Sequence, residues 1–202
     1  SPSGAIARTR YNRCMNDLQE LTVSLEDLDE AGSFKIAAER LTAWARAFTG
    51  CESAILRLVE QDGDASWLAG CAIDGVHDDF ARDETMVHSA ECICGRVAMG
   101  VIDTSLPFYS EAGSFSWGRL STLSQDFAPA QLGPLRGRCM KECFESMAVF
   151  PLRAGRRTVG SLHLADSRAD WFSGAFEVVE AVCRLAGAVL FRYQAREREQ
   201  TV

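Results

Sequence analysis

Two apolar segments near the end of the chain, joined by a short polar turn, constrain the fold more than any other feature. Residues 146–154 (SMAVFPLRA) and 158–166 (TVGSLHLAD) have the length and apolar content of buried strands, and GRR separates them. This pattern predicts an antiparallel β-hairpin. Pro151 has no amide proton to donate to a sheet, so we expect it at an edge or at a bulge.

Other segments extend this hairpin to a mixed α+β fold. Residues 53–60 (SAILRLVE) and 66–74 (SWLAGCAID) flank the turn QDGD and predict a second hairpin. A helix is expected from Phe34 to Phe48, because Ser33 is a favourable N-cap and Gly50 a favourable stop. The chain has 202 residues and is 47% hydrophobic, which fits one domain with extensions better than two full domains.

Apolar residues at alternating spacings of three and four predict a helix at each end of the chain. The N-terminal stripe consists of Tyr11, Cys14, Leu18, Leu21, Leu25 and Leu28, and the C-terminal stripe of Phe176, Val179, Cys183, Ala186, Leu190 and Tyr193. Both stripes could simply cover the core of the domain. Two matching stripes at opposite ends favour a terminal helix bundle that also forms a homodimer.

Charge and hydropathy exclude several classes of function. The formal net charge is −7 and the pI about 5.0, which argues against nucleic acid as a partner, because phosphate binding needs a basic surface. No run of 18 or more apolar residues is present, and SPSGAIARTR lacks the apolar core of a secretion signal, so we expect no membrane span and a cytoplasmic protein. A group of arginines is interpreted as solvated loop and turn surface: Arg136, Arg138, Arg153, Arg156 and Arg157.

About seventy residues between the two hairpins show little strand pattern. So long an irregular stretch in a compact domain usually lines a site or forms a lid. It holds aromatic residues and an acid that could line a pocket, or whose rings could pin the loop onto the core: Phe108, Phe115, Trp117 and Glu111. Further candidates for ligand contacts lie at the last hairpin, where they are Glu145, Ser146 and His163. His163 alternates with two leucines and therefore faces away from them, toward a pocket or toward solvent.

Eight cysteines are many for a domain expected in a reducing compartment. Four of them lie in the long connection as two pairs, Cys92 with Cys94 and Cys139 with Cys143. The second pair would project from one face of a helix, and the first could aim two sulfurs from a tight loop. Three interpretations stay open: small buried side chains, a redox pair or reactive thiol, and a zinc or iron–sulfur site made by all four. The other cysteines are interpreted as structural: Cys14, Cys51, Cys71 and Cys183.

The order of these elements resembles that of GAF domains. The segments that carry the likeness are CESAILRLVE (51–60), ECICGRVAMG (91–100), ESMAVFPLRAGRRTVGSLHLAD (145–166) and WFSGAFEVVEAVCRLAGAVL (171–190). The resemblance implies an α+β fold, with an antiparallel sheet, helices on one face, a ligand pocket on the other, and flanking N- and C-terminal helices. The chain then divides into an N-terminal signalling or dimerisation helix (1–32), a GAF-like sensory domain (33–193) and a C-terminal helix extension (194–202).

Domains of this family sit in signalling proteins such as histidine kinases, so the resemblance implies a non-catalytic sensory domain. A small ligand, or redox change or metal binding at the cysteines, would shift the terminal helices and act on an output domain outside this chain. The alternative is a cysteine-dependent enzyme similar to free methionine sulfoxide reductases, with Cys94 and Cys143 as its redox pair. A third reading is an interaction module with an empty pocket. The cyclic-nucleotide and bilin-binding branches are disfavoured, because their characteristic residues are absent.

Overall fold

The computed structural model describes Gln19, Thr22 and residues 25–200. This part of the chain contains both helices and strands. In order they are α2 (Phe34–Thr49), β1 (Ser53–Asp62), β2 (Ala65–Asp74), α3 (Asp78–Asp83), β3 (Met86–His88), α4 (Ile93–Met99), β4 (Phe115–Trp117), α5 (Leu120–Asp126), α6 (Pro129–Leu132), α7 (Arg138–Lys141), β5 (Ser146–Ala154), β6 (Arg157–Asp166), the short 3-10 helix η1 (Trp171–Gly174) and α8 (Phe176–Gln200).

The six strands form one antiparallel sheet in the order β3-β2-β1-β6-β5-β4. Both predicted hairpins are confirmed, as β1–β2 and β5–β6, and they meet in the middle of the sheet where β1 pairs with β6. Pro151 lies beyond the part of β5 that pairs with β4, since that pairing covers residues 147–149, and beside a register irregularity at Leu152 and Arg153. The missing proline amide therefore breaks no ladder hydrogen bond on that side.

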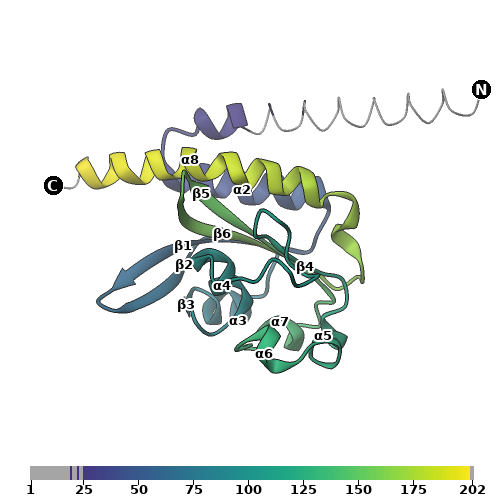
Figure 1. Ribbon diagram of the computed structural model, residues 1–202. Coiled ribbons are helices and arrows are strands. Elements are labelled where there is room, and N and C mark those ends of the chain that lie inside the picture. Colours follow the sequence, from purple (N-terminus) through teal and green to yellow (C-terminus); the bar gives the residue numbers. More distant parts are fainter. Residues whose placement is uncertain (1–18, 20–21, 23–24, 201–202) are drawn as a thin grey trace, which may run out of the picture.

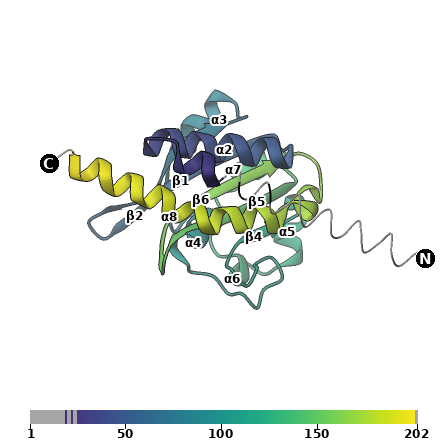
Figure 2. The same ribbon diagram turned by 90° about the horizontal axis from the view of Figure 1, so that it is seen from above.

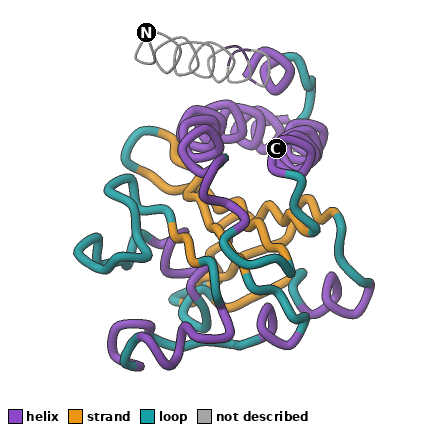
Figure 3. Tube along the Cα trace, turned by 90° about the vertical axis from the view of Figure 1, so that its right-hand side faces the viewer, coloured by secondary structure: helices purple, strands orange, loops and turns teal. Residues whose placement is uncertain are grey.

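Each face of the sheet carries its own core. Helices α2 and α8 cover one face (Figure 1), and the view from above shows them running beside each other across the strands (Figure 2). The short helices and loops of the long connection cover the other face, so that the sheet lies between two layers (Figure 3). Alternation along β6 divides the cores, because Leu162 and Leu164 pack under the long helices while Ala165 packs under the connection.

The two long helices follow the signals in their sequences. Ser33 caps α2, its hydroxyl accepting from the amide of Ile36 at 3.3 Å, and Gly50 ends the helix in the left-handed conformation at φ 63°. The predicted C-terminal helix is confirmed as α8, and its apolar stripe packs against the sheet, so this stripe covers the core of the domain. The N-terminal stripe lies outside the described residues, except for Leu25, which packs against this core, and Leu28, which is buried in it. No helix in the described ranges is long and apolar enough to cross a membrane.

Helix α8 approaches β5 most closely at a glycine. A Cβ atom at Gly187 would collide with the backbone nitrogen and oxygen of Arg153. Backbone cannot move aside as a flexible side chain can, so this contact fixes the distance between α8 and the sheet.

Gly187→Ala should therefore destabilise the protein, although alanine is the better helix former. We expect a loss of about 1–3 kcal/mol in the free energy of unfolding, because the helix must lift from β5 to make room. Denaturant unfolding followed by circular dichroism measures this loss. Gly174→Ala is the matched control, since its Cβ would meet nothing within 4 Å. Equal stability of the two variants would contradict the close approach.

Candidate functional site

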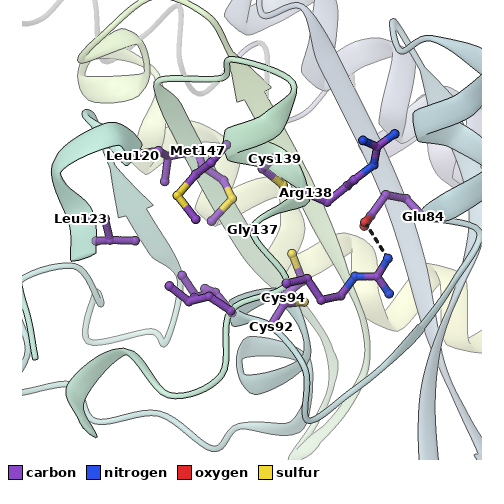
Figure 4. Close-up of a pocket in the computed structure, with 13 residues that line it drawn as sticks. Glu84, Cys92, Cys94, Leu120, Leu123, Gly137, Arg138, Cys139 and Met147 are labelled. Atoms are coloured by element: carbon purple, nitrogen blue, oxygen red, sulfur yellow. Dashed lines mark ion pairs between the residues drawn. The ribbon is translucent and has the colours of Figure 1, made fainter. Parts of the chain in front are cut away.

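A pocket opens on the sheet face opposite α2 and α8, between α4, α5, the segment around α7 and β5. Its volume is about 50 Å³, which is room for a few water molecules and small for a metabolite site. Apolar side chains form one wall, and thiols and charged groups form the other (Figure 4). The lining residues are Glu84, Cys92, Ile93, Cys94, Leu120, Leu123, Leu135, Arg136, Gly137, Arg138, Cys139, Met140 and Met147.

A tight entry into α4 brings two of the thiols to this pocket. Cys92 is the N-cap residue of α4 and Cys94 lies in its first turn. Gly95 allows the entry, because a Cβ there would collide with the carbonyl group of Ser89. The sequence ECICG therefore folds the chain back on itself and holds both sulfurs at the end of one short helix.

The two neighbouring thiols differ in proton affinity. The pKa of Cys92 is lowered to about 6, because the Cys94 thiol donates to its sulfur, and the amide of Gly95 and the positive charge of Arg57 add to this against the effect of burial. The pKa of Cys94 is raised well above its usual range by the same hydrogen bond and by burial. At neutral pH the pair therefore holds one negative charge on Cys92 and one proton on Cys94.

Cys139, on α7, supplies the third thiol from another part of the connection. Its pKa is raised to about 12 by burial and then by the charge of Glu84, so it is protonated at neutral pH. Its sulfur lies 3.7 Å from Nε2 of His163 on β6. His163 is fully buried, and burial followed by the nearby Arg57 lowers its pKa to about 3, so its ring is neutral.

A buried ion pair lies beside the thiols. Arg57 on β1 is only 1% exposed, and its guanidinium lies 2.6 Å from a carboxylate oxygen of Glu84. Arg136 approaches the other oxygen of Glu84 at 3.4 Å, the contact drawn as a dashed line in Figure 4, and also approaches Glu91 at 3.4 Å. This network joins the middle of the sheet to the connection that covers it.

Several buried polar atoms on this face of the sheet have no hydrogen-bond partner among the described residues. They include Nη1 of Arg57, Oγ of Ser161 and Nδ1 of His163. Arg57 and Ser161 are cross-strand partners, and His163 is two residues further along the same face of β6. Each unpaired group costs about 1–3 kcal/mol when buried, so this strip of the sheet is suited to a polar ligand.

The structure groups three of the four cysteines predicted as a site and separates the fourth. Cys92, Cys94 and Cys139 line one pocket, whereas Cys143 is exposed. The expectation that Cys139 and Cys143 share one helix face is wrong, because α7 ends at Lys141 and Cys143 adopts a left-handed conformation at φ 61°.

Within the described residues, no group of three or more His, Cys, Asp or Glu side chains could hold a metal ion, so the arrangement does not fit the zinc or iron–sulfur site.

The predicted ligand contacts lie around the pocket or away from it. Phe115 is buried in an aromatic cluster with Phe108, which also contacts Trp117, and this cluster pins the loop onto the core. Glu111 is exposed. None of these four lines the thiol pocket.

The two candidates at the start of β5 have structural partners. Glu145 accepts from the hydroxyl of Ser121 at 2.9 Å. The hydroxyl of Ser146 donates to the carbonyl of Arg168 at 2.6 Å and accepts from the amide of Trp171 at 3.0 Å, which secures the turn before η1. Their role in ligand binding, like that of the aromatic residues, stays a prediction.

Two central residues of the site were not predicted from the sequence. Arg57 and Glu84 are far apart in sequence and neither belongs to a motif. Arg57 did carry a signal, because it stands between leucines in an apolar strand and on the same face as Ile55. A charged residue at such a position is rarely buried unless it is paired, which calls for an acidic partner elsewhere.

No protein-family model and no curated protein matches this chain. Solved structures do match it. The GAF domain of an Acinetobacter phosphoenolpyruvate-protein phosphotransferase superposes with a TM-score of 0.65 at 12% identity, over 90% of this chain and 97% of the other. This chain has the GAF fold.

Two further solved structures that match this chain have names that describe different roles, one a sensor and the other an enzyme. The GAF domain of a sensor histidine kinase from Pseudomonas syringae pv. tomato matches with a TM-score of 0.60 at 14% identity, over 96% of this chain and 98% of the other. Free methionine-R-sulfoxide reductase from Neisseria meningitidis, solved with its substrate, matches with a TM-score of 0.64 at 12% identity, over 89% and 91%. At such identities the likeness shows the fold and leaves the activity open.

Removing one partner of the buried ion pair should destabilise the protein strongly. Glu84→Ala leaves Arg57 charged, buried and poorly paired, and we expect a loss of about 3–5 kcal/mol in the free energy of unfolding. The double variant Arg57→Leu/Glu84→Leu removes both charges and should lose much less. Denaturant unfolding compares the variants. Asp79→Ala, which breaks an exposed pair with Arg82, is the control and should change the free energy of unfolding by under about 1 kcal/mol. A change of the same size in Glu84→Ala as in Asp79→Ala would contradict the prediction.

Proposed function

We propose that this chain is a sensory domain whose input acts on the thiols of the pocket and whose output passes through the terminal helices. The observation that carries the proposal is a thiolate-favouring Cys92 placed in one pocket with two protonated thiols, Cys94 and Cys139. A thiolate reacts with oxidants far faster than a thiol, and neighbouring thiols allow a reversible response.

A peroxide is the class of oxidant that fits this arrangement. The Cys92 thiolate would attack one oxygen of hydrogen peroxide, which breaks the O–O bond, forms a sulfenic acid and releases hydroxide. The thiol of Cys94 or Cys139 would then attack the sulfenic sulfur and form a disulfide, with loss of water. Two thiols are thereby oxidised and one peroxide is reduced to two waters. A small polar ligand that reached the unpaired atoms of Arg57 and His163, which are buried and do not line this pocket, is the other proposed input.

Strand β5 provides a route from the pocket to the helices. Met147 at its start lines the pocket, while Phe150 and Leu152 belong to the core under α2 and α8. Gly187 of α8 then rests directly on the backbone of Arg153. A change in the pocket that moves β5 would therefore also move α8, because the two elements are in direct contact and no flexible link lies between them.

We propose that the chain forms a homodimer and passes its signal to a separate output domain. Leu185 on α8 is 43% exposed, and Leu25 and Val189 line an open groove beside it. A second copy of this chain would cover these apolar side chains.

Seven cysteines in the described part of the chain are free thiols, which supports our proposal of a reducing, cytoplasmic location.

Cys92 should react with an alkylating reagent at a lower pH than an ordinary cysteine. With a pKa of about 6, its thiolate fraction is half at pH 6 and nearly complete at pH 7.5. Peptide mapping by mass spectrometry after brief iodoacetamide treatment gives the rate at each pH. An unstructured cysteine peptide, with a pKa of about 8.5, is the reference. A Cys92 profile that coincides with the peptide would contradict the assigned charge distribution.

Peroxide should produce an intramolecular disulfide that includes Cys92 and should change hydrogen exchange in α8. The second effect is expected because β5 joins the pocket to Gly187. Cys92→Ser should abolish both effects, whereas Cys143→Ser, which removes an exposed thiol outside the pocket, should leave them unchanged. A disulfide that forms with no change in α8 exchange would refute the sensory part of the proposal.

A thiol-dependent reductase is the second candidate function, favoured by the presence of Cys94 and Cys139 in the same pocket. Cys139 is proposed here as the partner in such a pair in place of Cys143, because Cys139 lines the pocket and Cys143 is exposed. One thiolate would attack the sulfur of methionine sulfoxide, the second thiol would close the disulfide, and methionine and water would leave. NADPH consumption with free methionine sulfoxide and a thioredoxin system tests this reaction. Sustained turnover that Cys139→Ser abolishes would assign an enzyme, and its absence would leave the sensor.

A further inference from the structure

A second and larger cavity lies at the other end of α4, away from the thiols. It has a volume of about 380 Å³ and lies where the end of α4, the turn between β5 and β6, and the last turns of α8 come together. Four arginines line it, Arg153, Arg156, Arg157 and Arg198, and none of its lining residues is acidic.

These four arginines differ from most arginines in the described part of the chain because they lack ion-pair partners. Elsewhere most arginines are paired with a carboxylate, as the buried Arg57 is with Glu84. Among the described residues, no carboxylate lies within ion-pair distance of Arg153, Arg156, Arg157 or Arg198. The whole chain carries 28 acidic residues against 21 basic ones, so four unpaired arginines around one cavity form a local reversal of charge.

The remaining lining groups suit a small molecule with both polar and apolar parts. Gln61, Gln194 and Thr158 supply further hydrogen-bond donors. Val59 and Met99 supply an apolar wall. The guanidinium of Arg157 is already held in place over the ring of Phe191, 5.8 Å from its centre, which reduces the entropy that binding would cost.

We propose that this cavity binds a phosphorylated small molecule with two or more negative charges. Guanidinium groups match phosphate oxygens in paired hydrogen bonds, and several of them at one cavity favour a polyanion over a single charge. The volume lies within the usual range for small-molecule sites, whereas the thiol pocket falls below it. Three of the five arginines interpreted from the sequence as solvated loop and turn surface, Arg153, Arg156 and Arg157, thus acquire a common role.

Binding at this cavity would tie together three elements that connect to the rest of the domain. Arg156 and Arg157 lie at the β5–β6 turn and the start of β6, Arg198 lies at the end of α8, and Met99 ends the helix that Cys92 caps. A bound anion would draw the turn and the end of α8 toward each other. The site would act as a second input on α8, at a place separate from the thiol pocket.

Inorganic pyrophosphate without added metal is the probe for this site. Isothermal titration calorimetry on the full chain, at an ionic strength held constant with potassium chloride, should show saturable binding. Arg156→Gln/Arg157→Gln should weaken it by at least about tenfold, because each lost guanidinium removes a charge-assisted contact. Both arginines are exposed, so the double variant is expected to fold, which circular dichroism checks.

Arg184→Gln is the matched control, because Arg184 is an exposed arginine on α8 that does not line the cavity. It should leave the affinity within about twofold, since it removes only a distant charge. No saturable binding at matched ionic strength, or equal weakening by both sets of variants, would overturn the proposal. Binding of poly-glutamate but not of pyrophosphate would overturn it in favour of an acidic protein surface.

Discussion

The buried ion pair between Arg57 and Glu84 is the interaction on which the site depends. A charged guanidinium in the middle of a sheet is unstable unless a carboxylate reaches it, and Glu84 reaches it from the connection that covers this face. The pair therefore holds the connection on the sheet. The hydrogen bond from Cys94 is the main cause of the lowered pKa of Cys92, burial is the main cause of the lowered pKa of His163, and the positive charge of Arg57 adds to both. One ion pair thus closes the pocket and contributes to its electrostatics.

The division of the sheet into two cores explains how one strand can serve two layers. Strand alternation directs Met147 and Val149 of β5 to the connection, and it directs Phe150 and Leu152, on either side of Pro151, to the core under the long helices. The pairing with β4 stops before Pro151, so the second half of β5 depends on β6 and α8 alone. The half of β5 that meets α8 is therefore less restrained by the sheet than the half that meets the pocket.

The regular elements could be predicted from the sequence because their signals are local. Apolar segments of strand length joined by short polar turns defined both hairpins, and the N-cap Ser33 and stop Gly50 defined α2 within a residue or two. The site is different, since Cys139 reaches Cys92 and Cys94 only through the path of an irregular loop. Spacing suggested Cys143 as the partner of Cys139 on a helix, but α7 is one turn long and ends before Cys143. Loop paths are set by long-range contacts such as Arg57 with Glu84, which no local pattern encodes.

Helix α4 connects the two proposed sites, with thiols at its first turn and the arginine-lined cavity at its last residue. It is only seven residues long and buries Val97 and Ala98 against the sheet, so it moves as a unit or not at all. A disulfide at Cys92 or Cys94 would tilt its start, and an anion at the far cavity would restrain its end. The two inputs would therefore be coupled through a rigid element, and by linkage each would change the free energy of the other by the same amount.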